Sequence, residues 1–151
     1  TENASVRSVS DFDDLKICWN NITNNVRKLF LYFHGQAGSL EFKQSGSIPS
    51  NRITNKNGFK KKSNLREIYL IICHGAVGGS KKERRVSVAR RFYDLTNKKA
   101  NVYASKYYVN FRYAKKKGRS DKVYYPKYGG IDKIRDLSGK KNPVKLTYRR
   151  K

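Results

Sequence analysis

Apolar side chains near the N-terminus recur at alternating steps of three and four residues, which places them on one face of a helix. The stripe consists of Phe12, Leu15, Trp19, Ile22, Val26 and Leu29. Ser10 can cap the first turn, and Arg27 and Lys28 suit the last turn. Cys18 lies beside the stripe and is expected to pack against the protein interior. The pattern therefore predicts an amphipathic helix over residues 11–28.

Three short apolar runs follow this helix. They are LFLYF at 29–33, IYLII at 68–72 and NVYAS at 101–105. The first two runs show no alternation of apolar and polar side chains, which is typical of parallel strands that are buried on both faces. A helix is expected between the second and third runs, so that strand, helix and strand form a right-handed βαβ unit. The predicted fold class is α/β, with a mostly parallel sheet flanked by helices.

The helix between the second and third runs has a start signal of its own. Ser80 and Glu83 match the Ser-x-x-Glu capping box found at helix N-termini. We expect the helix to continue from there to about Thr96. Its inward face should carry Val86, Ala89, Phe92 and Tyr93.

Two other stretches depart from this pattern. Residues 43–64 are polar, with Gly, Pro and a run of three lysines, and they predict a long, mobile loop. Residues 106–151 alternate aromatic and basic side chains around a turn at 115–119, and they predict a β-hairpin with Tyr107, Val109, Phe111 and Tyr113 on one face. We expect one domain over residues 1–151, made of an N-terminal helix (1–28), an α/β core (29–105) and a basic, β-rich C-terminal tail (106–151).

The strongest overall feature of the composition is its charge. The chain has 35 basic and 11 acidic residues, so its net charge is +24. Residues 1–40 hold four basic and four acidic side chains, so the excess lies in the rest of the chain. Such a field attracts polyanions: nucleic acid, inositol phosphates, anionic lipid or an acidic protein. A purely solvated surface would leave this self-repulsion without compensation.

Cysteine and histidine are scarce. Cys18 and Cys73 are too few for a disulfide scaffold, although one bridge between them stays open, and His34 and His74 lack zinc-finger spacing, so no metal site is predicted. No apolar stretch is long enough to span a membrane, and no signal-peptide pattern is present. The chain contains no methionine, so Thr1 is not an initiator, and we expect a domain of a longer protein.

Two of the predicted strands end alike, in Phe33-His34-Gly35 and in Ile72-Cys73-His74-Gly75. Functional groups gather at the carboxyl ends of parallel strands. A thiolate is a nucleophile that a nearby imidazole can activate, which makes Cys73 and His34 candidates for catalysis. Gly35 and Gly75 would let a substrate carbonyl approach backbone N–H groups, as an oxyanion site requires.

This order of motifs resembles the caspase-like (clan CD) cysteine peptidases, especially the domains found in large bacterial toxins and surface proteins. LFLYFHGQAGSLEF looks like the His-Gly segment of that family, and IYLIICHGAVGG looks like its Cys segment. SVARRFYDLTNKKANVYAS is similar to the helix and strand that follow. The likeness covers roughly residues 29–105. The chain departs from the family pattern in having Ile72 before the cysteine and Phe33 before the histidine.

The resemblance implies a caspase-like sheet and a catalytic dyad. Cys73 would be the thiol nucleophile and His34 the general acid/base that protonates the leaving amine, while His74, a competing imidazole, should point away from Cys73. It also implies a toxin or effector domain, secreted or delivered as part of a larger bacterial protein, that cuts a protein substrate in the target cytosol. An acidic immunity or inhibitor protein is the expected partner.

The resemblance further implies that a polyanion activates the peptidase. Some toxin proteases of this type are switched on by inositol hexakisphosphate held in a pocket of Lys and Arg. No other cofactor is expected. The candidate polyanion-binding residues are Lys81, Lys82, Arg84, Arg85, Arg90, Arg91, Lys115, Lys116, Lys117 and Arg119.

Two other functions stay open on the sequence. Interleaved aromatic and basic residues, as in KYYVNFRYAKKKGR and VKLTYRRK, suit phosphate contact with base stacking, so a toxin nuclease is the first alternative. His34 or His74 with a Lys or Arg would then cleave RNA, rather than DNA, by metal-free acid/base chemistry. The second alternative is a non-catalytic polyanion-binding module, which leaves the FHG and CHG segments unexplained.

Overall fold

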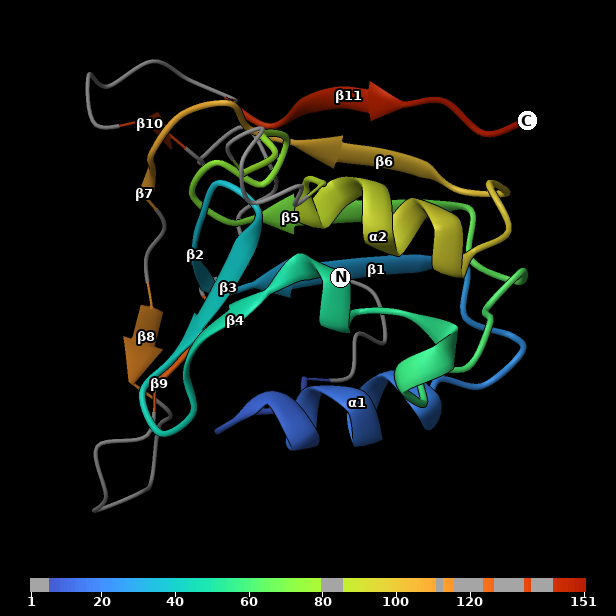
Figure 1. Cartoon of the computed structure of the whole chain (residues 1–151), viewed down its shortest axis with the longest axis horizontal. Coiled ribbons are helices and arrows are strands. Elements are labelled where there is room, and N and C mark those ends of the chain that lie inside the picture. The colour runs from blue at the N-terminus through green and yellow to red at the C-terminus, as the bar shows by residue number, and fades with distance from the viewer. Residues whose placement is uncertain (1–5, 80–85, 111–112, 116–123, 127–134, 137–142) are drawn as a thin grey trace.

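The computed structural model describes residues 6–79, 86–110, 113–115, 124–126, 135–136 and 143–151. Its main sheet has four strands in the order β1-β5-β6-β11 (Figure 1). Their bounds are Lys28–Tyr32 (β1), Glu67–Ile71 (β5), Asn101–Ala104 (β6) and Lys145–Tyr148 (β11). The first three strands are parallel, and β11 runs antiparallel to β6. The three apolar runs in the sequence therefore do form a mostly parallel sheet.

The two strands that precede the His-Gly segments differ in burial. β5 lies at the centre of the sheet, where residues 68–71 are all buried. β1 lies at the edge, and of its residues only Leu31 is fully buried. The expectation that β1 is buried on both faces is therefore wrong. An apolar run can equally serve an edge strand whose aromatic side chains are half covered.

Helix α1 (Phe12–Asn20) is shorter than predicted. Asp11, rather than Ser10, is its N-cap, because the Asp11 carboxylate accepts the backbone N–H of Asp14 at 2.8 Å. The helix ends at Asn20 because the buried Lys62 ammonium donates hydrogen bonds to the carbonyls of Asn20 and Ile22, at 2.9 and 2.7 Å. The rest of the predicted stripe still packs against the core, from a turn and from β1.

Helix α2 (Val88–Leu95) begins later than expected. Its N-cap is Ser87, whose hydroxyl accepts the backbone N–H of Arg90 at 3.1 Å. The predicted capping box at 80–83 lies outside the described residues. Ala89, Phe92 and Tyr93 are buried as predicted, whereas Val86 precedes the helix and is 37% exposed. The local hydroxyl at Ser87 therefore decides where this helix starts.

Residues 43–64 do not form the long loop that was predicted. A three-stranded antiparallel sheet is built from β2 (His34–Gln36), β3 (Ser39–Phe42) and β4 (Gly46–Pro49). Two short 3-10 helices follow, η1 (Ser50–Arg52) and η2 (Asn55–Asn57). Ile48, Ile53 and Phe59 are buried, so a few widely spaced apolar anchors hold a polar segment in place.

The described parts of the C-terminal region contain short antiparallel strands. β8 (Tyr113–Lys115) pairs antiparallel with β9 (Tyr124–Pro126), and β7 (Val109–Asn110) pairs with β10 (Arg135–Asp136). The connecting residues of the predicted hairpin, and Phe111, lie outside the described residues. Tyr107 and Val109 do not share a face, because Tyr107 is 55% exposed on a bend while Val109 is buried in β7.

The main sheet separates two clusters of buried residues. The larger cluster lies between the sheet and the helices, and it includes Ile68, Leu70 and Ile72 of the central segment. The smaller one lies on the opposite face, where Tyr69 and Ile71 meet Val109 and Val144. None of the helices in the described part of the chain has the length and apolar character needed to cross a membrane.

Candidate active site

The carboxyl ends of β1 and β5 meet at one edge of the sheet. The last aligned pair of these parallel strands is Tyr32 with Ile71, and the backbone N–H of Phe33 still donates to the Ile71 carbonyl at 3.4 Å. The same register, continued by two residues, aligns His34 with Cys73. The sequence premise that these two residues follow neighbouring strands is therefore confirmed, and their segments lie side by side.

Gly35 is the closest approach between these two segments. A Cβ atom at Gly35 would lie 2.5 Å from Cγ2 of Ile72 and 3.0 Å from the carbonyl oxygen of Ser39. It would also lie 3.6 Å from the carbonyl oxygen of Cys73. The bulky Ile72, which departs from the family pattern, therefore packs directly on Gly35. A glycine is needed here to let the backbone of β2 touch the cysteine segment.

The Cys73 side chain lies on the sheet face opposite α2. It is half-buried beside Tyr69, Ile71 and Val109. Its Sγ atom accepts the backbone N–H of Val109 at 3.3 Å and lies 3.7 Å from the Val109 carbonyl oxygen. The thiol is thus held against the backbone of Val109 in β7. Sequence reasoning missed Val109, because only tertiary packing brings β7 over the thiol.

His34 lies in β2 at an exposed position and is paired with Glu41 of β3. Directly paired residues of an antiparallel hairpin have neighbouring side chains on the same face. The Glu41 carboxylate accepts a hydrogen bond from Nε2 of Gln36 at 2.5 Å. Glu41 is therefore the carboxylate nearest to His34 along the hairpin register. The sequence signal for this pairing was the small-residue turn between the two short strands, which brings Glu41 opposite His34.

His74 has a different environment from His34. Its backbone has a left-handed φ of 55°, and its backbone N–H donates to the Tyr107 carbonyl at 3.0 Å. Its ring nitrogen Nδ1 lies 2.9 Å from the Lys106 carbonyl oxygen, and the ring contacts Tyr108 edge-on with centroids 4.5 Å apart. The imidazole is thus engaged by residues 106–108.

Gly75 belongs to the turn that connects β5 toward α2. Its N–H donates to the Ile72 carbonyl at 3.2 Å, and its carbonyl accepts the N–H of Ala89 at 3.0 Å. Both backbone groups are therefore used inside the fold. Gly75 serves the turn, and its N–H is not directed at an oxyanion in this conformation.

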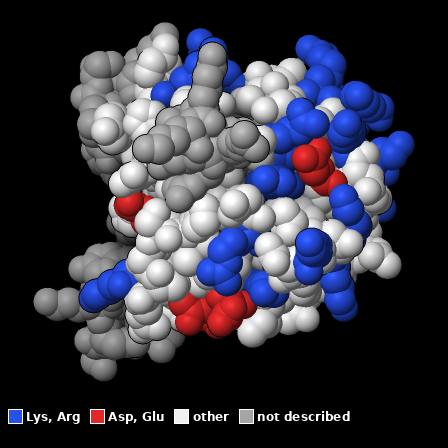
Figure 2. Space-filling view, viewed as in Figure 1, with Lys and Arg blue, Asp and Glu red and all other residues white. Residues whose placement is uncertain are grey.

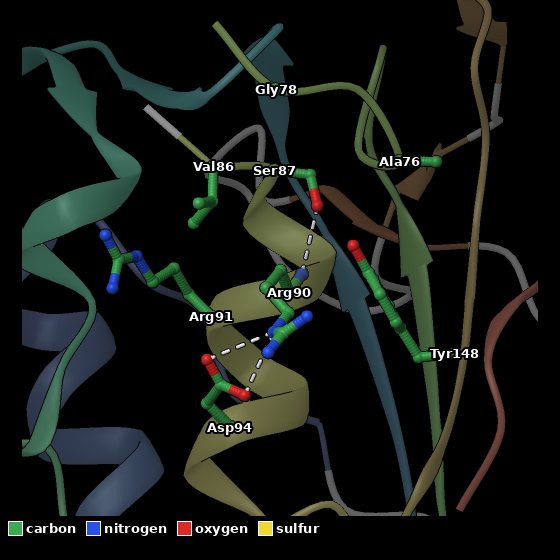
Figure 3. A pocket seen from close by; sticks show the side chains of 8 residues that line it. All are labelled: Ala76, Gly78, Val86, Ser87, Arg90, Arg91, Asp94 and Tyr148. Carbon is green, nitrogen blue, oxygen red and sulfur yellow. Dashed lines mark hydrogen bonds and ion pairs between the residues drawn. The ribbon is translucent and has the colours of Figure 1, made fainter. Parts of the chain in front are cut away.

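Of the predicted polyanion-binding residues, only Arg90 and Arg91 have described side chains. They line a cavity of about 490 Å³ beside the start of α2, together with Ser87, Asp94 and Tyr148 (Figure 3). Nε of Arg90 donates to the Asp94 carboxylate at 3.1 Å, and its guanidinium lies 5.7 Å from the Tyr148 ring centroid. The other members lie outside the described side chains: Lys81, Lys82, Arg84, Arg85, Lys115, Lys116, Lys117 and Arg119.

Arg91 leaves α2 on the side away from Arg90 and Tyr148 (Figure 3). Its Nε atom is buried and has no hydrogen-bond partner among the described residues. Arg90 is already paired with Asp94. The two guanidinium groups diverge, so the described residues alone do not form a converging cage for an inositol phosphate.

No group of three or more His, Cys, Asp or Glu side chains in the described parts of the chain is close enough together to hold a metal ion. Cys18 and Cys73 are both free thiols. The reactive groups at this edge of the sheet are therefore one thiol and two imidazoles, together with the backbone around them.

Comparison with known proteins does not assign the chain to a family. No protein-family model matches the chain, and neither a curated protein nor a solved structure shows significant similarity to it. The resemblance to caspase-like peptidases stays a prediction, and the function must be argued from the site.

Proposed function

We propose that this chain is a caspase-like cysteine endopeptidase domain with a dyad of His34 and Cys73. The observation that supports it most is the register of β1 and β5, whose last aligned pair, Tyr32 with Ile71, lies two residues before His34 and Cys73. A thiol and an imidazole at such an edge have the composition and placement that nucleophilic catalysis needs.

Cys73 and His34 have different roles in the proposed reaction. His34 takes up the thiol proton of Cys73 as Sγ attacks the carbonyl carbon of the scissile peptide bond. The C–N bond then breaks as His34 passes that proton to the leaving amine. Water then attacks the thioester while His34 takes up its proton, which releases the carboxylate product and the free thiol. The Val109 N–H, 3.3 Å from Sγ, holds the sulfur in place before attack.

Two neighbours support these roles. Glu41, the pairing partner of His34 in the hairpin, is positioned to orient a protonated imidazole. His74 takes no part in catalysis, because residues 106–108 already engage its ring and backbone.

The wider role follows from the same proposal. The domain acts as a toxin or effector on a protein substrate in the cytosol of a target cell, after delivery as part of a larger bacterial protein. Its charge of +24 suits an acidic immunity protein as the natural inhibitor. Arg90 and Arg91, which line the cavity beside α2, are the described candidates for contact with an activating inositol phosphate.

The test uses the two cysteines as a matched pair. Purified protein is incubated with a peptide library, with and without inositol hexakisphosphate, and new termini are detected by mass spectrometry. Wild type and Cys18→Ala should cleave the library, and Cys73→Ala should not.

Three outcomes would overturn the proposal. The first is cleavage that survives Cys73→Ala. The second is a wild-type protein that cleaves no peptide under either condition. The third is RNA degradation that stops with His34→Ala or His74→Ala but continues with Cys73→Ala, which would establish the nuclease alternative.

A further inference from the structure

A group of basic residues lies at the end of the main sheet opposite to His34 and Cys73. This is the end where β5 and β6 begin and β11 finishes, and basic side chains crowd that side of the molecule in Figure 2. We call it the basic end. Its members are Arg27, Lys61, Arg66, Lys98, Lys99, Arg149, Arg150 and Lys151.

Backbone hydrogen bonds hold this surface together. The N–H of Asn101 donates to the carbonyl of Arg66 at 2.8 Å, and the Asn101 side chain accepts the N–H of Arg150 at 2.8 Å. The N–H of Lys151 donates to the Lys98 carbonyl at 2.9 Å. Residues distant in sequence are thus fixed next to one another, and their long side chains project from an ordered frame.

The turn after α2 adds to the same surface. Asn97 and Lys98 both have a left-handed backbone, with φ of 55° and 61°. Lys61 reaches the α2 C-terminus, where its Nζ donates to the Asp94 carbonyl at 2.9 Å. Strained backbone at two consecutive residues is tolerated only where surrounding contacts hold it, so the position of Lys98 is specified by the fold.

The basic end has no acidic counterpart in the described residues. Of the nearby carboxylates, Asp94 is paired with Arg90 and Glu67 with Lys28. No ion pair joins a member of the basic end to a carboxylate within the described part of the chain. Arg27, Lys61 and Arg66 donate to backbone carbonyls, but no described carboxylate neutralises these cations. Counterions would therefore gather here, and a polyanion would release them on binding.

The kind of polyanion follows from what this surface lacks. Protein interfaces depend on apolar and aromatic anchors at their centre. Among the residues that the structure describes, the exposed large apolar side chains all lie outside the basic end: Val6, Ile17, Val86, Tyr107, Tyr108 and Leu146. A surface of Lys and Arg without anchors suits phosphate groups, which bind through charge and without base readout.

We propose that the basic end binds the sugar-phosphate backbone of nucleic acid, without sequence preference. This site is separate from the candidate dyad and does not depend on the proposed peptidase activity. The two lie at opposite ends of the sheet, so binding and cleavage can be tested independently.

The test measures affinity for a short labelled single-stranded RNA and for duplex DNA over a series of salt concentrations. The triple variant Lys98→Gln, Arg150→Gln, Lys151→Gln keeps every backbone contact. If each cation neutralises one phosphate, the salt slope for RNA should shrink by about 2 and affinity at 0.1 M salt should fall by roughly 100-fold. Cys73→Ala should bind like wild type.

A charge-matched control separates this site from net charge. Arg7→Gln, Lys43→Gln, Lys145→Gln removes three exposed cations elsewhere and should bind nearly as wild type does. An equal loss in both triple variants would overturn the proposal, because binding would then follow total charge. Salt-sensitive binding to polyglutamate without binding to either nucleic acid would also overturn it and would indicate an acidic protein partner.

Discussion

The His-Gly dipeptide occurs twice after a strand of the same parallel sheet, yet the two copies have different surroundings. His34 is exposed in a β-hairpin, and the neighbouring Gly35 lies where a Cβ would clash with Ile72. His74 has a left-handed backbone and contacts Lys106 and Tyr108, and Gly75 next to it has room for a Cβ.

The difference arises from the strands that precede the two copies. β1 is an edge strand, so the chain that leaves it can fold into a hairpin and keep His34 at the surface. β5 is central and continues into a turn between α2 and residues 105–108, where backbone hydrogen bonds hold His74, Gly75 and Ala76. The same dipeptide therefore lies in an exposed hairpin in one copy and in a turn fixed by tertiary contacts in the other.

The largest expected effect separates the two imidazoles. His34→Asn should lower peptide cleavage by about 10²- to 10⁴-fold, the range for loss of a general acid/base. His74→Asn should change cleavage by no more than about tenfold, because Asn tolerates the left-handed backbone at this position. Initial cleavage rates, with circular dichroism to verify folding, make the comparison.

A reversed order would break this comparison. If His74→Asn lost the activity and His34→Asn retained it, the imidazole beside Tyr108 would be the catalytic one.

The two glycines should differ next. Gly35→Ala would place a Cβ 2.5 Å from Ile72 Cγ2, and overpacking of this kind costs about 1–3 kcal/mol of unfolding free energy. Gly75→Ala would meet its nearest atom at 3.4 Å, so its stability should stay within about 0.5 kcal/mol of wild type. Urea denaturation measures both.

A double variant tests the stated cause. Gly35→Ala combined with Ile72→Ala should be less destabilised than the sum of the single changes, by about 0.5–3 kcal/mol for residues in contact. Strict additivity would mean that Ile72 is not the obstacle at Gly35.

The smallest effect concerns the burial of β5 and appears only at high pH. Burial raises the pKa of Tyr69 from 10.0 to about 12, and the nearby Glu67 carboxylate adds to the rise. The folded state therefore holds this proton more tightly, so its contribution to stability is complete below pH 10 and is lost as pH rises toward 12.

Tyr69→Phe removes this ionisable hydroxyl, so the free energy of unfolding should depend less on pH between pH 10 and 12. Unfolding free energy between pH 9 and 12 provides the measurement, with the exposed Tyr107→Phe as control. Identical profiles for the two variants would show that β5 is not buried enough to suppress ionisation.

Much of the sheet follows from short apolar runs. Residues 29–33, 68–72 and 101–105 have enough apolar side chains to require burial, and their spacing around a helix leaves little choice but parallel pairing. The helix faces were also readable, since Phe12, Leu15 and Trp19 pack as their period predicts.

The ends of the helices and the structure of residues 43–64 could not be predicted from the sequence in the same way. The end of α1 depends on Lys62, whose hydrogen bonds to Asn20 and Ile22 span 42 and 40 residues along the chain. The order in residues 43–64 depends on a few separated anchors such as Ile48, Ile53 and Phe59. The local sequence does not indicate contacts between residues so far apart along the chain.

The sequence by itself determined that His34 and Cys73 each follow an apolar strand, because burial and period are properties of neighbouring residues. Only the tertiary structure decided that β1 and β5 are adjacent and in a register that pairs Tyr32 with Ile71, two residues before His34 and Cys73. It also decided that Val109 contacts the thiol and that residues 106–108 engage His74. These are long-range contacts, whose energies exist only once the chain has folded.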